Sequence, residues 1–240
     1  IGQPLGTLTI TVAAIDDLAS WILLAAVVAY ARTGSAWGAL DPLLRTTAWA
    51  LVLLVGLRPL RRWLERTYRR RGELGPLLQV SLMAGALLSG AVTESIGVHL
   101  IFGAFLWGLA MPRYGPLHQA LELRLHAVVV QLMLPLFFAI SGLNTKLLAL
   151  NSPDLWLATA VVLLVAVAGK FLGTWATARL SGVPPREAQA LGWLVNTRGL
   201  TELVILNVGL SLGVISTTLF SMGVLMAITT TVMTGPLLER

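Results

Sequence analysis

The chain has 240 residues, of which 56% are hydrophobic and only 12% are charged. Soluble domains carry about 25% charged residues. Several apolar runs here are also long enough for a helix to cross a bilayer. The composition therefore excludes an ordinary soluble domain and predicts an all-α, polytopic membrane protein. Cysteine is absent, which excludes disulfides and thiolate metal sites within the chain.

Hydropathy predicts about eight transmembrane helices. In chain order they cover residues 7–30, 46–63, 74–92, 97–111, 126–143, 155–180, 188–210 and 214–238. Proline-containing pairs such as Asp41-Pro42 and Gly75-Pro76 are expected to mark the connections. Residues 114–125 have the pattern of an amphipathic helix that lies in the membrane interface.

The net charge of +6 comes largely from one arginine-rich stretch, residues 58–71. Beside an apolar run, such a stretch indicates membrane orientation and contact with anionic lipid headgroups, so no nucleic-acid partner is expected. Twelve basic residues lie in one alternating set of connections and three in the other. The first set is Arg58, Arg61, Arg62, Arg66, Arg69, Arg70, Arg71, Arg113, Arg124, Arg179, Arg186 and Arg240; the second is Arg32, Arg45 and Lys146. This asymmetry predicts that both ends of the chain are cytoplasmic.

Charged side chains also occur inside the predicted spans. Asp16 and Asp17 are adjacent near the middle of the first span, and Lys170 lies in the sixth. Lys170 has no opposite charge within four residues, so it needs a partner from another helix, and the aspartates are the candidates. A purely structural ion pair is one alternative, but a single lysine leaves one carboxylate uncompensated. Such a carboxylate takes up a proton or holds a cation, which is the chemistry of proton-for-cation exchange.

A second polar segment interrupts the seventh span. Its sequence is Asn196-Thr197-Arg198-Gly199-Leu200-Thr201-Glu202. Polar residues and a glycine at this depth predict a broken helix near residues 196–202, as transporters use beside ion sites. A continuous helix with a polar stripe is the alternative. For Arg198 and Glu202, a self-neutralising i, i+4 salt bridge and a functional role both remain open.

Other features favour structural roles. Gly103, Gly108 and Ser89, and the Gly169/Gly173 pair, are expected to allow close helix packing. Pro135 is expected to kink its helix. No nucleotide fingerprint, phosphate-binding loop or nucleophilic triad occurs, so neither a cofactor nor catalytic residues are expected.

Five motifs together resemble the cation:proton antiporter superfamily, in the branch of bacterial Kef-type potassium efflux systems and plant cation/proton exchangers. They are Ala14-Ile15-Asp16-Asp17; the run from Ile101-Phe102-Gly103-Ala104-Phe105 to Met111-Pro112-Arg113; Leu134-Pro135-Leu136-Phe137-Phe138 with Ser141-Gly142-Leu143; Gly169-Lys170; and Asn196-Thr197-Arg198-Gly199-Leu200-Thr201-Glu202-Leu203. The resemblance runs through nearly the whole chain in order.

The resemblance implies a fold of two inverted repeats, with a core domain that moves against a dimerisation domain and a homodimer at full length. The acidic pair would lie on the fifth helix and the lysine on the tenth. If the first span here is the fifth, residues 196–202 fall on the eleventh. The chain would then be the C-terminal portion of an exchanger's transmembrane domain, without about four preceding helices.

The same resemblance implies residue roles. Asp17 would carry the proton or a transported Na⁺ or K⁺, and Asp16 would pair with Lys170. Asn196, Thr197, Arg198 and Glu202 would form the polar part of the broken helix. The expected location is a bacterial plasma membrane. A channel-like permeation subunit and a non-transporting assembly module are the alternatives.

Overall fold

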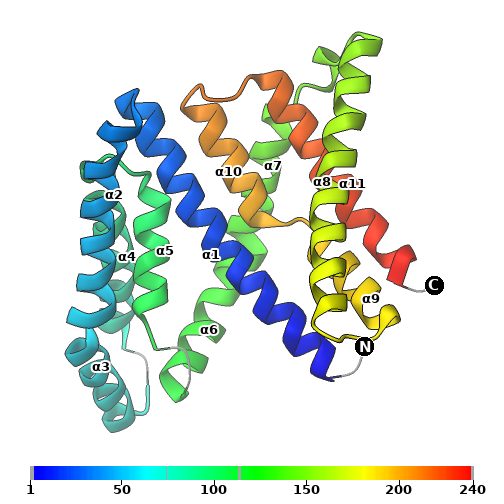
Figure 1. The fold of residues 1–240 in the computed structure, drawn as a ribbon. Helices are drawn as coiled ribbons and strands as arrows, with labels where there is room; N and C mark the ends of the chain where they lie inside the picture. The colour runs from blue at the N-terminus through cyan, green and yellow to red at the C-terminus, as the bar shows by residue number, and fades with distance from the viewer. Residues whose placement is uncertain (1–2, 74, 113–114, 239–240) are drawn as a thin grey trace. The chain divides into compact units, whose positions relative to one another are not determined.

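The computed structural model describes residues 3–73, 75–112 and 115–238, and every regular element in these ranges is helical (Figure 1). The predicted all-α class is confirmed. Leu74, Arg113, Tyr114 and Arg240, which entered the sequence predictions, lie outside the described residues. The chain divides into two compact units: the first comprises Ile1–Ser20 and Ile140–Arg240, and the second comprises Trp21–Ala139.

The helices follow one another with short connections. In order they are α1 (Gln3–Thr33), α2 (Ala36–Leu51), the π turn η1 (Val52–Gly56), α3 (Arg58–Arg71), α4 (Pro76–Ile96), α5 (Leu100–Ala110), α6 (Pro116–Val128), the π turn η2 (Val129–Met133), α7 (Leu134–Asn144), the 3₁₀ turn η3 (Leu147–Ala149), α8 (Pro153–Leu180), α9 (Pro185–Asn196), α10 (Leu200–Ser211) and α11 (Thr217–Leu238). The border between the units falls within α1 and again within α7.

Five of the eight predicted spans match helices that are long and apolar enough to cross a membrane, among the residues that the structure describes. These helical stretches are Leu5–Thr33, Trp37–Gly56, Pro116–Ala149, Pro153–Leu180 and Thr217–Leu238. The predicted third span corresponds to α4. The fourth is only the short helix α5, whose 11 residues reach about half of a 30 Å hydrocarbon core. The seventh is divided between α9 and α10.

The predicted start of the second span was wrong by about ten residues. The helix begins after Ser35, whose side-chain oxygen accepts a hydrogen bond from the Gly38 N–H at 2.9 Å and so caps α2. Pro42, taken as a connection, lies inside α2. The arginines that follow form the separate amphipathic helix α3, which ends at Gly72 in the left-handed conformation (φ 70°).

The helix predicted at residues 114–125 is present as α6, and it is the first part of the longer apolar helical stretch Pro116–Ala149. Helix α6 begins at Pro116 and continues through η2 into α7. Proline has no backbone N–H, so Pro135 cannot complete the regular hydrogen bond to the carbonyl four residues earlier. The wider π turn η2 ends at Met133, two residues before Pro135, and accommodates the missing hydrogen bond.

Helices α4 and α5 form the closest helix pair of the second unit. Ser89 is buried on α4 and donates a hydrogen bond to the Gly103 carbonyl of α5 at 2.6 Å, and Trp49 Nε1 donates to Ser89 Oγ. A Cβ at Gly103 would lie 2.2 Å from the Ser89 carbonyl oxygen, so the packing role predicted for these two residues is confirmed. At Gly108, Gly169 and Gly173 a Cβ would meet no neighbouring helix within 4 Å, so the described residues show no close packing there.

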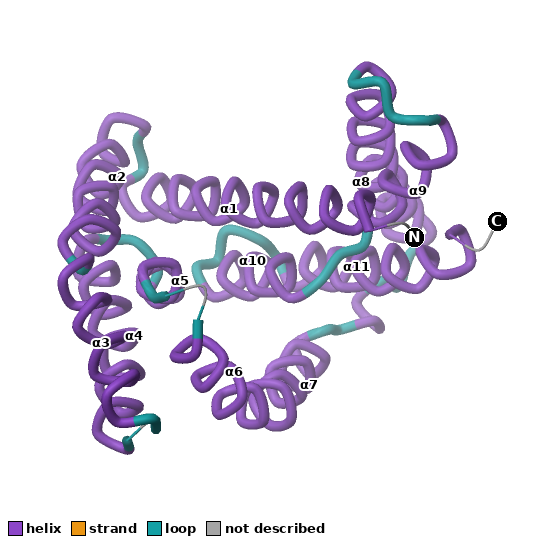
Figure 2. The backbone as a smooth tube through the Cα atoms, turned by 90° about the horizontal axis from the view of Figure 1, so that it is seen from below, coloured by secondary structure: helices purple, strands orange, loops and turns teal. Residues whose placement is uncertain are grey.

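In the first unit, α11 contacts α8, α9 and α10 (Figures 1 and 2). Helix α8 packs against α9 through Phe171, which lies over Gly192 and against the Trp193 ring at a centroid distance of 4.2 Å. At the other end of the same helices, buried Ala178, Ala188 and Leu191 form an apolar cluster with Leu5 of α1. These contacts hold α8 and α9 in fixed register, which positions the segment that follows α9.

Gly103→Ala should destabilise the second unit, because the new methyl group has no space between α4 and α5. Overpacking of this kind costs about 1–3 kcal/mol. Gly108→Ala is the matched control on the same helix, and it should leave stability nearly unchanged or slightly raise it. Thermal unfolding of the purified proteins in detergent measures the difference. Equal unfolding temperatures for the two variants would contradict the packing of α4 on α5.

Candidate ion-binding site

The acidic pair lies on the unbroken helix α1, in the part that belongs to the first unit. Consecutive residues on a helix point about 100° apart, so Asp16 and Asp17 face different directions. Asp16 is partly buried, whereas Asp17 is exposed. The two carboxylates therefore have unequal surroundings although they are neighbours in the sequence.

Lys170, near the middle of α8, reaches Asp16. Its Nζ lies 2.7 Å from Asp16 Oδ2, and the two residues are 154 positions apart in the sequence. The lysine side chain is 27% exposed and the aspartate 41%. Lys170 was predicted to need a partner from another helix, and Asp16 is that partner. Asp17 is left without a basic partner among the described residues.

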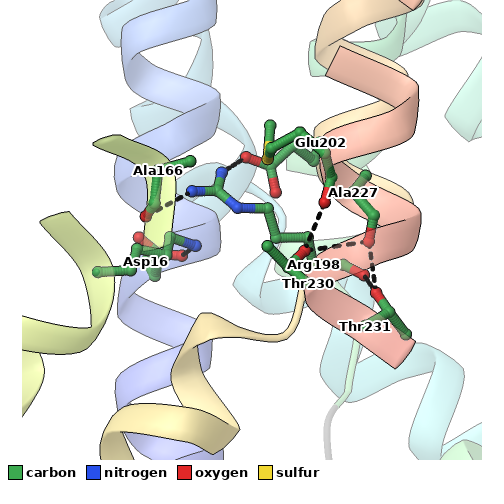
Figure 3. Close-up of polar contacts among 9 residues, drawn as sticks. Asp16, Ala166, Arg198, Glu202, Ala227, Thr230 and Thr231 are labelled. Atoms are coloured by element: carbon green, nitrogen blue, oxygen red, sulfur yellow. Dashed lines mark hydrogen bonds and ion pairs between the residues drawn. The ribbon is translucent and has the colours of Figure 1, made fainter. Parts of the chain in front are cut away.

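The helix break lies beside this pair. Helix α9 ends at Asn196, residues 197–199 are not helical, and α10 begins at Leu200, so the predicted broken helix is confirmed. Arg198 in the break forms an ion pair with Glu202 one turn into α10. Its Nη2 also donates a hydrogen bond to the Ala166 carbonyl of α8 at 3.2 Å, as Figure 3 shows.

An open cavity of about 480 Å³ joins these elements, and all of its lining residues belong to the first unit. Asp16, Asp17 and Lys170 line it, together with residues 197–202 of the break and the first turn of α10. Ser20 also lines it, one turn after Asp16 on α1. The sequence reasoning missed Ser20, although helical spacing from the acidic pair was a signal that could have identified it.

Asn196 is the last residue of α9 and so lies at the predicted break, but it is not part of the cavity. It is fully buried, it does not line the cavity, and neither its side-chain oxygen nor its side-chain nitrogen has a hydrogen-bond partner among the described residues. The structure brings together the other predicted residues Asp16, Asp17, Lys170, Thr197, Arg198 and Glu202. The motif pattern could not separate Asn196 from these, because the direction of each side chain depends on how the end of α9 is rotated against its neighbours.

The donor set of the cavity suits a small hard cation. It presents carboxylate oxygens from Asp16 and Asp17 and hydroxyl groups from Ser20, Thr197 and Thr201. Oxygen ligands of this type bind alkali and alkaline-earth cations. No group of three or more His, Cys, Asp or Glu residues able to hold a metal ion occurs within residues 3–73, 75–112 and 115–238.

A polytopic helical protein with opposite charges and a helix break around one cavity has the construction of a membrane ion transporter. The family description "Sodium/hydrogen exchanger, transmembrane" matches residues 1–240. The chain belongs to this family and is an integral membrane protein.

Curated relatives support the same placement. The Na(+)/H(+) antiporter NhaS4 of Synechocystis is 44% identical over 99% of this chain and 58% of that protein. Cation/H(+) antiporter 20 of Arabidopsis thaliana is 38% identical over 97% of this chain and 29% of its own length. K(+)/H(+) antiporter 1 of Saccharomyces cerevisiae is 36% identical over 98% and 27%, respectively. The chain therefore spans little more than half of the first relative and less than a third of the other two.

Glu202→Gln should destabilise the protein, because it keeps the side-chain shape but leaves the buried Arg198 guanidinium without its carboxylate. Arg198 is only 9% exposed and Glu202 23%. Breaking a buried pair costs on the order of 3 kcal/mol.

The control is Asp41→Asn, which removes an i, i+4 pair with Arg45 in which both side chains are 64% exposed. Such a pair contributes less than about 1 kcal/mol. Thermal unfolding compares them, and equal losses would show that Arg198 does not depend on Glu202.

Proposed function

We propose that the protein is a secondary antiporter that exchanges a monovalent cation, Na⁺ or K⁺, for protons by alternating access. The observation that carries this proposal is the Asp16–Lys170 ion pair beside an uncompensated Asp17 in one open cavity. The relatives named for Na⁺/H⁺, K⁺/H⁺ and cation/H⁺ antiport support the class of substrate.

The charge balance of the cavity explains how one site serves two ions. Arg198 and Glu202 neutralise each other, and Lys170 neutralises one of the two aspartates. One negative charge is left, which we assign to Asp17. A proton on Asp17 or a monovalent cation beside it restores neutrality, so each occupant excludes the other. This competition is what couples the two fluxes.

The Asp16–Lys170 ion pair gives the site two further arrangements, one with the pair closed and one with it open. While the ion pair is closed, Asp16 is not free to contact a cation. If an entering cation draws the Asp16 carboxylate toward itself, the lysine loses its partner, so cation entry opens the ion pair. Thr197, in the break, lines the same cavity.

The helix break supports alternating access. A non-helical segment at membrane depth is tolerated where it lines a cavity, and residues 197–199 do line one. The first turn of α10 also lines the cavity, and the N-terminal end of a helix carries a partial positive charge that favours nearby carboxylates. We further propose that this chain is the C-terminal portion of an inverted-repeat exchanger domain that works as a homodimer. Both ends of the chain would be cytoplasmic, in a bacterial plasma membrane.

Asp17→Asn in the full-length protein should abolish cation-driven proton movement, because the amide can neither carry the proton nor neutralise the cation. The measurement is dissipation of a pH gradient in proteoliposomes after addition of Na⁺, K⁺ or Li⁺, each tested separately. Asp154→Asn is the control, since it makes the same change on an exposed residue of α8 outside the cavity. Retained exchange in Asp17→Asn would rule out this residue as the carrier. Cation conductance without proton counter-flow in the wild type would instead favour a channel.

A further inference from the structure

The break between α9 and α10 is held from the side by helix α11. A helix that stops leaves carbonyl groups without their usual partners. Thr231 Oγ1 of α11 donates a hydrogen bond to the Arg198 carbonyl in the break at 2.7 Å (Figure 3). One turn along α11, Thr234 Oγ1 accepts a hydrogen bond from Thr197 Oγ1 at 2.9 Å. Two successive residues of the break are thus bound to two threonines of one neighbouring helix.

These contacts differ from the ordinary behaviour of threonine in a helix. A helical threonine commonly bonds only to the carbonyl four residues earlier, and Thr229 on α11 does so, with Leu225 as its acceptor. Thr231 reaches the Ala227 carbonyl in the same way but also lies within bonding distance of Arg198. Thr229 therefore provides an internal comparison on the same helix.

The Arg198 side chain links the break to helix α8 as well. Its backbone is bound to α11, and its guanidinium donates to the Ala166 carbonyl of α8. Ala166 lies one helical turn before Lys170, so this carbonyl is in the turn that carries the lysine. Figure 3 shows Arg198 extending from Thr231 toward Ala166 and Asp16. A shift of the break relative to α11 would be transmitted to the wall of the cavity that holds the ion pair.

We propose that Thr231 and Thr234 are positioning residues of the transport site. The Thr231 hydroxyl binds the backbone of the break at Arg198, and the Thr234 hydroxyl binds the side chain of Thr197. Together they keep the break in place, hold the Arg198 guanidinium against α8, and so set the geometry around Asp16 and Lys170. Neither threonine lines the cavity, so neither contacts the transported ion in this arrangement. The inference rests on the proposed antiport function for its transport readout, but the geometry of the break can be tested without transport.

The transport test uses Thr231→Val, which keeps the side-chain shape and removes the hydroxyl, in the full-length protein. Loss of one hydrogen bond should raise the KM for the cation about 3- to 10-fold, with a smaller effect on the maximal rate. Thr231→Ser restores the hydroxyl and should recover the wild-type KM. Thr229→Val should behave as wild type. If Thr231→Val and Thr229→Val have the same KM, or if Thr231→Ser fails to recover it, the positioning role is overturned.

A labelling test separates this inference from the proposed function. These 240 residues contain no cysteine, so Leu200→Cys, with any cysteine elsewhere in the full-length protein replaced by serine, introduces a single thiol in the first turn after the break, where Leu200 lines the cavity. The rate of maleimide labelling, measured without an ion gradient, should change at least about threefold when Thr231→Val is added and stay unchanged with Thr229→Val. A change in labelling in a protein that shows no antiport would support the positioning contact and refute the proposed function. Antiport with unchanged labelling and KM would refute the positioning contact alone.

Discussion

The contact between Lys170 and Asp16 is the interaction on which the site depends. Each residue lies on a long apolar helix, where an isolated charge is costly. Their approach to 2.7 Å makes both charges tolerable and joins α1 to α8 across 154 residues of sequence. The same contact determines which aspartate is left free. If Lys170 bonded Asp17 instead, the uncompensated carboxylate would lie on a different side of α1.

The helix break extends the same principle to Arg198. Residues of three different helices contact Arg198. It forms an ion pair with Glu202 of α10, its guanidinium donates a hydrogen bond to the Ala166 carbonyl of α8, and its own carbonyl accepts one from Thr231 of α11. An unpaired guanidinium inside the membrane would cost a large free energy of desolvation. These partners therefore stabilise the non-helical conformation of the chain at Arg198. The apolar packing of α8 on α9 through Phe171 supports them by fixing where α9 ends. These contacts therefore fix the conformation of the non-helical residues 197–199.

The success of the sequence predictions varied with the strength of the local signal. Helix α8 was expected at 155–180 and is observed at Pro153–Leu180, because Ser152 and Pro153 form an N-terminal cap before a long uninterrupted apolar run. The start of α2 was misplaced, because Pro42 was read as a breaker and the cap at Ser35 was overlooked. Helix α5 lies within its predicted span of 97–111 and begins three residues later, since hydropathy detects apolar sequence but not where a helix begins. Glycines that were all expected to be packing positions also had unequal surroundings, with Gly103 tightly packed and Gly169 open.

The sequence by itself determined the helical membrane class, the position of the break and the chemical types present at membrane depth. Composition, apolar run length and the rarity of buried charge are properties of the chain that do not depend on how helices are arranged. The resemblance to the antiporter superfamily implied that Lys170 pairs with Asp16, and the structure shows that contact. Only the tertiary structure decided that Asn196 does not line the cavity and that Ser20 does. The threonines of α11 acquired their partners in the same way. Each of these outcomes depends on the rotation and register of one helix against another, and packing between residues distant in the sequence sets both.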